Sequence, residues 1–423
     1  MELYNFQKEI LKASEGLSRV AYYLDMGLGK TFIGAEKMKQ LNAPINLVVC
    51  QKSKIEDWKE HFKSYYDYEL FDLTKSKEFN KFEEAVKTKT KTKHKITAII
   101  NYDILWRRDL DLVLNSYNFT LMLDESSLIQ NMQAERTSFV VRDLRPANVI
   151  LLSGTPVGGK YENLYSQMYL LGYREKYMSF FAEYIKYKSI KALNGYDVII
   201  PTGYKNEEKL KILLKSLGCF FMKTEEVIEL PKQNFIDVKL RKPWGYEELL
   251  KKPLKKCEHA EFVRMIELRK LSGVNTEKET ALLDLLSSSQ SRFIIFYCYD
   301  DELEIIKKVC KKLHRPTSVV NGHEKDLSCY ETKEDCITLI QYQAGAMGLN
   351  LQKANKIIFY SPTFRSELYE QAKKRIHRIG QEKTCFYYLL KAGFDFTVYK
   401  VLEKREDYTN KLFIKEYKFE EET

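Results

Sequence analysis

The first stretch with the composition of a chemical site is a glycine-rich loop, Asp25–Thr31, between an apolar run and a helical pattern. Gly27 and Gly29 allow backbone N–H groups to close on phosphate oxygens at a helix N-terminus. Lys30 places a point charge near β- and γ-phosphates, and the Thr31 hydroxyl can ligate Mg²⁺. The loop therefore predicts a site for a nucleoside triphosphate.

Two adjacent carboxylates, Asp124 and Glu125, directly follow the apolar run Phe119–Leu123. At the C-terminal end of a strand, Asp124 can hold Mg²⁺ through water, and Glu125 can orient and deprotonate an attacking water molecule. This pair favours hydrolysis over kinase chemistry.

A hydroxyl-bearing turn follows a third apolar run, Val149–Leu152. Ser153 and Thr155 in this turn can sense the state of the acidic pair through hydrogen bonds. We interpret them as coupling residues, and the alternative is a plain turn that ends a strand.

A basic segment far along the chain, Gln371–Gln381, contains Arg375 and Arg378. On a helix, a spacing of three residues places both guanidinium groups on one side. Such groups suit a developing phosphoryl charge, and an arginine finger can be worth roughly 10³ to 10⁵ in rate. His377 is assigned a structural role.

These residues require a scaffold of buried parallel strands. Short apolar runs alternate with helical stretches in two parts of the chain, which indicates βαβ units. The runs are Val20–Leu24, Leu47–Cys50, Ile96–Ile100, Phe119–Leu123 and Val149–Leu152, then Phe293–Phe296, Thr317–Val320, Ile337–Ile340, Lys356–Tyr360 and Phe386–Leu390. The region between them, Tyr161–Ser289, is dominated by helical periodicity. The sequence predicts an α/β protein with two parallel-sheet lobes and a mostly helical middle.

Composition narrows the class further. The 423 residues suggest two domains, and 44% hydrophobic with 30% charged residues is typical of a globular protein. The longest purely apolar runs are too short to span a membrane, so we expect a cytoplasmic protein without a membrane partner. The net charge of +10 suits a polyanionic partner.

Taken together, the motifs of this sequence resemble those of a known family. The motifs DMGLGKT, LMLDESS, SGTP, AGAMGLNL and QAKKRIHRIGQ occur in the order and spacing of Swi/Snf-type ATPases, the superfamily two helicase-like DNA translocases, in a minimal bacterial or phage-like form. The resemblance implies two RecA-like lobes with helical protrusions, ATP and Mg²⁺ between the lobes, and tracking along duplex DNA without strand separation. The expected domains are 1–233, with a protrusion at about 161–217, and 234–423, with a protrusion at about 246–288.

The resemblance also implies roles for further residues. Gln7 resembles the glutamine that reads adenine, and the expected nucleotide contacts in the second lobe are Gly348, Asn350 and Gln371. The expected DNA contacts are Lys52, Ser53, Asn101, Tyr102, Tyr297, Gln341, Gln343 and Gly345.

Several positions depart from the family pattern. Ser127 stands where the acidic box has histidine, Gln341 and Tyr342 replace a serine–threonine pair, and Ala346 replaces a glycine. Leu24 occupies the position of the first glycine in the generic phosphate-loop pattern. These departures leave the ATP chemistry intact and predict altered coupling to DNA.

The main hypothesis is a DNA-stimulated ATPase that translocates on duplex DNA, and we expect a bare monomeric motor addressed by a separate protein partner. A strand-separating or branch-migrating helicase and a nucleotide-gated DNA clamp with little turnover remain alternatives.

Overall fold

The computed structural model describes residues 2–89, 95–191, 197–227, 229–252, 260–345 and 349–413. The chain divides into two compact units, one of Met1–Val227 with Asp407–Thr423 and the other of Ile228–Glu406. Within the described ranges, no helix combines the length and hydropathy needed to span a membrane.

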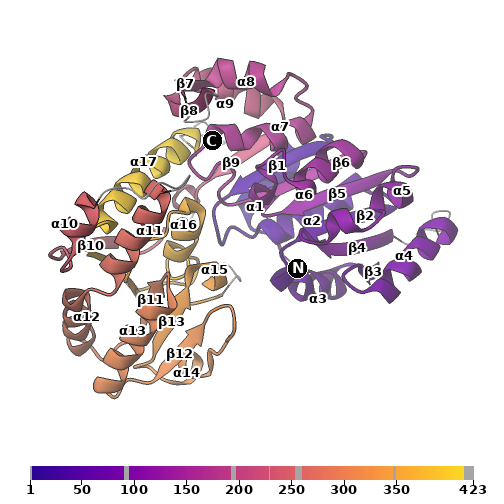
Figure 1. Cartoon of the computed structure of the whole chain (residues 1–423). Coiled ribbons are helices and arrows are strands. Elements are labelled where there is room, and N and C mark those ends of the chain that lie inside the picture. Colours follow the sequence, from indigo (N-terminus) through magenta and orange to yellow (C-terminus); the bar gives the residue numbers. More distant parts are fainter. Residues whose placement is uncertain are drawn as a thin grey trace, which may run out of the picture. The chain divides into compact units, whose positions relative to one another are not determined.

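The first unit is built on a seven-stranded parallel sheet with the strand order β3-β4-β2-β5-β6-β1-β9 (Figure 1). Its strands are β1 (Arg19–Leu24), β2 (Ile45–Cys50), β3 (Tyr68–Asp72), β4 (Lys95–Asn101), β5 (Phe119–Asp124), β6 (Asn148–Ser153) and β9 (Cys219–Met222). Its α-helices are α1 (Asn5–Ala13), α2 (Lys30–Leu41), α3 (Ile55–Tyr65), α4 (Ser76–Lys89), α5 (Leu110–Leu114), α6 (Glu135–Ser138), α7 (Tyr165–Leu171), α8 (Tyr177–Tyr184) and α9 (Glu207–Ser216). Short helical turns are η1 (Lys52–Lys54), η2 (Leu105–Arg107), η3 (Ser126–Ile129), η4 (Phe139–Asp143), η5 (Tyr161–Leu164) and η6 (Thr224–Glu226).

The second unit is built on a six-stranded parallel sheet with the order β10-β15-β14-β11-β13-β12. Its strands are β10 (Gln233–Lys239), β11 (Phe293–Tyr297), β12 (Thr317–Val320), β13 (Ile337–Gln341), β14 (Lys356–Phe359) and β15 (Cys385–Lys391). Its helices are α10 (Tyr246–Lys251), α11 (Ala260–Gly273), α12 (Thr276–Ser287), α13 (Asp300–Lys312), α14 (Ser328–Thr332), α15 (Tyr342–Gly345), α16 (Ser366–Lys373) and α17 (Asp395–Phe413).

Continuous apolar strands form these sheets because both faces are covered. In β11, Ile294 and Phe296 pack into one core cluster, whereas Phe293, Ile295 and Tyr297 pack into another. Successive side chains of a strand point to opposite faces, so an uninterrupted apolar run is the sequence of a strand with core on both sides. The predicted α/β class with two parallel sheets is confirmed, and all ten predicted strands are present.

The middle of the chain is less helical than predicted. An antiparallel hairpin of β7 (Ile185–Lys191) and β8 (Asp197–Tyr204) lies between α8 and α9 in the sequence. Strand β9 belongs to the sheet of the first unit, and β10 belongs to the sheet of the second. Strand β7 begins with Ile-Lys-Tyr-Lys, an alternation of period two that favours a half-exposed strand. Its lysines give it the composition of an exposed helix face, which explains why the helical periodicity expected for this region did not indicate the hairpin.

Candidate functional site

The predicted site residues of the first unit meet at one edge of its sheet. Strand β6 lies between β5 and β1 (Figure 1), with Tyr23 paired to Ser153 and Asp124 paired to Leu152. The carboxyl ends of adjacent parallel strands open on the same side. The glycine loop, the acidic pair and the Ser153 turn therefore lie at the same end of three neighbouring strands.

The glycine loop turns through left-handed backbone directly into α2. Gly27 has φ +91° and Gly29 has φ +72°, and α2 begins at Lys30. The Lys30 Nζ donates to the carbonyl oxygens of Leu24 at 2.9 Å and Asp25 at 3.2 Å. A Cβ added at Gly154 would lie 3.4 Å from this Nζ, so the Ser153 turn adjoins the lysine.

Gln7 is locked onto the same loop. Its Oε1 accepts from the Tyr4 N–H and its Nε2 donates to the Leu28 carbonyl oxygen, both at 3.0 Å. A Cβ at Gly29 would collide with Nε2 of Gln7. The N-terminal helix is thereby fixed to the loop that would hold a nucleotide.

Asp124 ends β5 as a half-buried carboxylate with defined partners. The indole Nε1 of Trp58 donates to its Oδ2 at 2.9 Å, and the Tyr102 hydroxyl donates to its main-chain oxygen at 2.8 Å. Burial raises the pKa of the Asp124 carboxyl, while the hydrogen bond from Trp58 and the charge of Lys30 act in the opposite direction.

Glu125 adopts a strained backbone. Its φ is +53° and its ψ is 56°, a conformation that non-glycine residues rarely adopt and that is found at functional sites. The following residue, Ser126, is fully buried and starts η3.

The Ser153 turn is closed by its own side chain. Its Oγ accepts from the backbone N–H of Thr155 at 3.1 Å, and both residues are buried. Within the described ranges, the Thr155 Oγ1 has no hydrogen-bond partner. A buried hydroxyl of this kind is available to the acidic pair or to a bound ligand.

Thr31 and Asp124 fit a magnesium ion chemically. A hydroxyl and a carboxylate are hard oxygen donors, which Mg²⁺ prefers. A cation would also compensate the charge of the Asp124 carboxylate, whose pKa is raised by desolvation.

The basic segment of the second unit departs from the helix predicted for it. Helix α16 ends at Lys373, so Arg375 and Arg378 lie in the turns that follow, and the prediction of one shared helix face is wrong. The cause is tertiary: the Gln381 Nε2 donates to the carbonyl oxygens of Gln352, Ala354 and Ile376, which holds the chain in turns.

Both arginines are nevertheless at least half-buried. Arg375 is buried and its Nη1 donates to the Leu349 carbonyl oxygen at 3.3 Å. Burial lowers the pKa of the Arg378 guanidinium. His377 is buried with its Nε2 2.9 Å from the Pro231 carbonyl oxygen, as a structural role requires.

The three predicted nucleotide contacts of the second unit differ in their surroundings. Gln371 is buried, and in the described part of the chain its Oε1 has no hydrogen-bond partner. Asn350 is exposed. Gly348 lies outside the described residues.

The predicted DNA contacts separate by exposure. Lys52 and Ser53 on η1 are exposed, as is Gln343 on α15, where Gly345 also lies. Gln341 is half-buried, and its Nε2 donates to the Cys298 carbonyl oxygen at 3.4 Å.

Three of the predicted DNA contacts have buried side chains. They are Asn101, Tyr102 and Tyr297, and their role in DNA binding stays a prediction. They are buried because each lies at the end of a strand that other elements cover. Tyr102 packs in the first unit's core and bonds the Asp124 backbone, and Tyr297 packs in the second unit's core.

Two residues that hydrogen-bond to the acidic segment Asp124–Ser126 were not identified from the sequence. Trp58 reads as an ordinary apolar position of α3, and nothing marks its indole as the donor to Asp124. Gln167 stands alone as an amide in the apolar run Leu164–Leu171, which is the signal of a buried, hydrogen-bonded side chain.

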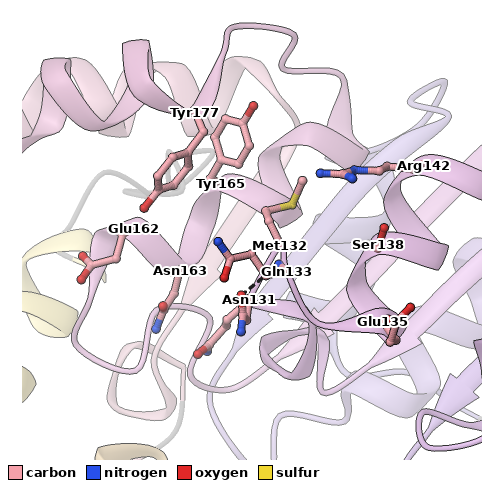
Figure 2. A pocket seen from close by; sticks show the side chains of 11 residues that line it. Asn131, Met132, Gln133, Glu135, Ser138, Arg142, Glu162, Asn163, Tyr165 and Tyr177 are labelled. Carbon is pink, nitrogen blue, oxygen red and sulfur yellow. Dashed lines mark hydrogen bonds between the residues drawn. The ribbon is translucent and has the colours of Figure 1, made fainter. Parts of the chain in front are cut away.

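A pocket of about 910 Å³ opens beside this network in the first unit (Figure 2). One wall is Gln130–Gln133, which follows η3. The other includes Asn163 on η5, Tyr165 at the start of α7 and Tyr177 on α8. Its lining combines amides with two tyrosine rings whose centroids lie 5.1 Å apart.

Comparison with known proteins places these motifs in a family. The profile of the SNF2-related domain matches residues 24–286, which is more than half of the chain. The profile of the helicase conserved C-terminal domain matches residues 277–380.

Individual relatives are distant. "SWI/SNF-related matrix-associated actin-dependent regulator of chromatin subfamily A-like protein 1" of Xenopus laevis is 26% identical over 87% of this chain and 39% of its own length. An uncharacterized ATP-dependent helicase of Mycoplasma pneumoniae is 21% identical over 99% of this chain and 43% of its own length. The putative ATP-dependent helicase/translocase YwqA of Bacillus subtilis is 23% identical over 85% of this chain and 42% of its own length. The chain thus spans about two fifths of the length of these relatives.

A solved structure, the "Sulfolobus solfataricus SWI2/SNF2 ATPase core in complex with dsDNA", is 18% identical, with a TM-score of 0.44 over 97% of this chain and 92% of that one. The extent of the two profile matches agrees with the motif resemblance. The chain therefore belongs to the SNF2-related family of ATP-hydrolysing enzymes.

Proposed function

We propose that this chain is a DNA-stimulated ATPase that translocates along duplex DNA and uses hydrolysis to track on DNA or to remodel complexes bound to it. One observation carries the proposal. The Lys30 loop follows β1 and Asp124 ends β5, at the same end of the two strands that flank β6, and the Ser153 turn at the end of β6 lies next to the lysine. This is the arrangement that phosphate binding and water activation need.

The first unit supplies most of the ATP chemistry in this proposal. Lys30 and the loop N–H groups bind phosphates, and Glu125 orients the attacking water and accepts its proton. A magnesium ion held by Thr31 and Asp124 neutralises phosphate charge when bound. Gln7, fixed beside the loop, contacts the adenine.

The second unit completes the site when the two units close on ATP. Arg375 and Arg378 then stabilise the charge that develops on the transferred phosphoryl group, and Gln371 and Asn350 contact the nucleotide. Closure and opening would convert each hydrolysis event into a step along DNA.

Duplex DNA is the proposed polymer. Exposed Lys52, Ser53 and Gln343 provide polar groups for the backbone, and the net charge of +10 favours a polyanion. The name of YwqA, a putative helicase/translocase, supports the same assignment. The motor is proposed to act as a monomer that a separate protein brings to its DNA.

The test is steady-state ATP hydrolysis with no polymer, single-stranded DNA, duplex DNA and RNA, with Glu125→Gln as the blank. Duplex DNA should stimulate most. Lys30→Ala should abolish the activity, whereas Lys39→Ala, an exposed lysine on the same helix, should not. Equal rates with every polymer, or a Lys30→Ala rate equal to wild type, would refute the proposal.

Two strand assays distinguish the alternatives. A translocase displaces a third strand from a triplex and leaves a forked duplex intact, whereas unwinding of the fork indicates a strand-separating helicase. DNA binding that depends on nucleotide without turnover indicates a clamp.

A further inference from the structure

Helix α7 carries a fully buried amide, Gln167, beside apolar residues such as Met168 and Leu171. Water does not reach it. A buried amide is costly unless its donors and acceptors are paired within the protein.

Its hydrogen bonds are saturated. The Gln167 Oε1 accepts from the Tyr23 hydroxyl at 3.1 Å and from the Ser126 Oγ at 2.8 Å. The Nε2 donates to the carbonyl oxygens of Pro156 at 2.9 Å and Asn163 at 3.4 Å. Two donors and two lone pairs are the full capacity of an amide, and the two carbonyls fix its orientation because they only accept.

Three of the four partners belong to the three segments that carry the ATP-site residues. Tyr23 lies in β1 just before the glycine loop, Ser126 follows Glu125, and Pro156 follows Thr155. One side chain thus joins the phosphate-binding, water-activating and coupling segments.

The contact to Ser126 bears directly on Glu125. A left-handed backbone at a non-glycine residue is unfavourable, so the surrounding structure must hold Glu125 in this conformation. The Ser126 side chain, next in sequence, is fixed by Gln167 at 2.8 Å.

We propose that Gln167 is a positioning residue for hydrolysis: it holds the Glu125 carboxylate in register with the glycine loop and the Ser153 turn without touching the nucleotide. Turnover therefore depends on this amide, whereas ATP affinity does not. The inference rests on the proposed ATPase activity.

The test compares Gln167→Leu with Ser166→Ala. Ser166 is the preceding residue, equally buried, and among the described residues its Oγ has no hydrogen-bond partner, so its variant controls for polar loss in α7. Gln167→Leu should lower DNA-stimulated kcat about tenfold while the Kd of a fluorescent ATP analogue changes less than about twofold. Ser166→Ala should keep both.

A double-mutant cycle identifies the route. Ser126→Ala breaks the link to the acidic box and leaves the rest of the Gln167 network in place. The double variant should lose no more kcat than Gln167→Leu alone, because both changes break the same hydrogen bond between Ser126 and Gln167. If Gln167→Leu does not fold, Ser126→Ala alone should show the kcat loss without a change in Kd.

Each result decides between the claims. Four outcomes would overturn the role of Gln167 and leave the proposed function standing. They are a wild-type kcat in folded Gln167→Leu, a loss of ATP affinity at unchanged kcat, fully additive kcat losses in the double-mutant cycle, and a wild-type kcat in Ser126→Ala. Absence of hydrolysis by the wild-type protein with every polymer overturns the proposed function and this inference together.

Discussion

The indole Nε1 of Trp58, on α3, donates a 2.9 Å hydrogen bond to Oδ2 of Asp124, at the end of β5. A residue without chemistry of its own therefore fixes the orientation of the carboxylate that would hold Mg²⁺. Outer partners of this kind often set the affinity of a metal site.

Trp58→Phe should keep the buried ring and lose this hydrogen bond. A hydrogen bond to a charged group is worth about 1.5–3 kcal/mol, so the Mg²⁺ concentration for half-maximal ATPase should rise at least about tenfold. Trp244→Phe, at a side chain 90% exposed in the other unit, is the control. An unchanged magnesium requirement in Trp58→Phe would mean that the indole does not orient Asp124.

Gly29→Ala should displace Gln7, because a Cβ at this position collides with the Gln7 amide. The affinity for an ATP analogue should fall about tenfold, and the preference for ATP over GTP should fall with it. Gly16→Ala is a matched control: its φ of +77° imposes the same backbone strain, but nothing lies within 4 Å of the added Cβ. Equal nucleotide binding by the two variants would contradict the assignment of Gln7.

Lys278→Met should destabilise the second unit. The Lys278 Nζ is fully buried 2.7 Å from Asp395 Oδ2 and 2.6 Å from the Tyr360 carbonyl oxygen. Removing it leaves a buried carboxylate without its cation, at a cost of about 3–5 kcal/mol. Hydrogen exchange of β14 amides measures this loss.

Lys308→Met provides the comparison for that variant, because Lys308 forms an exposed pair with Glu279 and should cost less than about 1 kcal/mol. Similar losses in the two lysine variants would show that the buried pair does not stabilise the unit.

His61 should make the stability of the first unit depend on pH. Burial lowers its pKa below 6.5, its ring packs edge-on against Phe32 at 4.7 Å, and among the described residues its Nε2 has no hydrogen-bond partner. The nearby Glu36 acts to raise the pKa but does not overcome burial.

Because the folded pKa is depressed, the unfolded chain binds the proton more readily. The contribution of neutral His61 is present above pH 6.5 and is lost as pH falls through the folded pKa. In urea unfolding at about pH 8 and about pH 5, His61→Phe should lose less stability on acidification than the wild type. An identical pH dependence in the two proteins would contradict a neutral, buried His61.

The sequence by itself determined the strands and the glycine loop. Apolar runs such as those of β1 and β11 specify buried strands through local periodicity, and the order of Lys30, Asp124 and Ser153 along parallel strands implies a common edge. Such features depend on neighbours within a few residues, so they can be inferred without coordinates.

The tertiary structure decided what no local pattern encodes. It buried Tyr102 and Tyr297, and it ended α16 before Arg375 through the side chain of Gln381. It also brought Gln167 to Tyr23, which lies 144 residues away in sequence. Burial and hydrogen-bond partners at such separations depend on which elements become neighbours when the sheet assembles, and residue spacing along the chain does not contain that information.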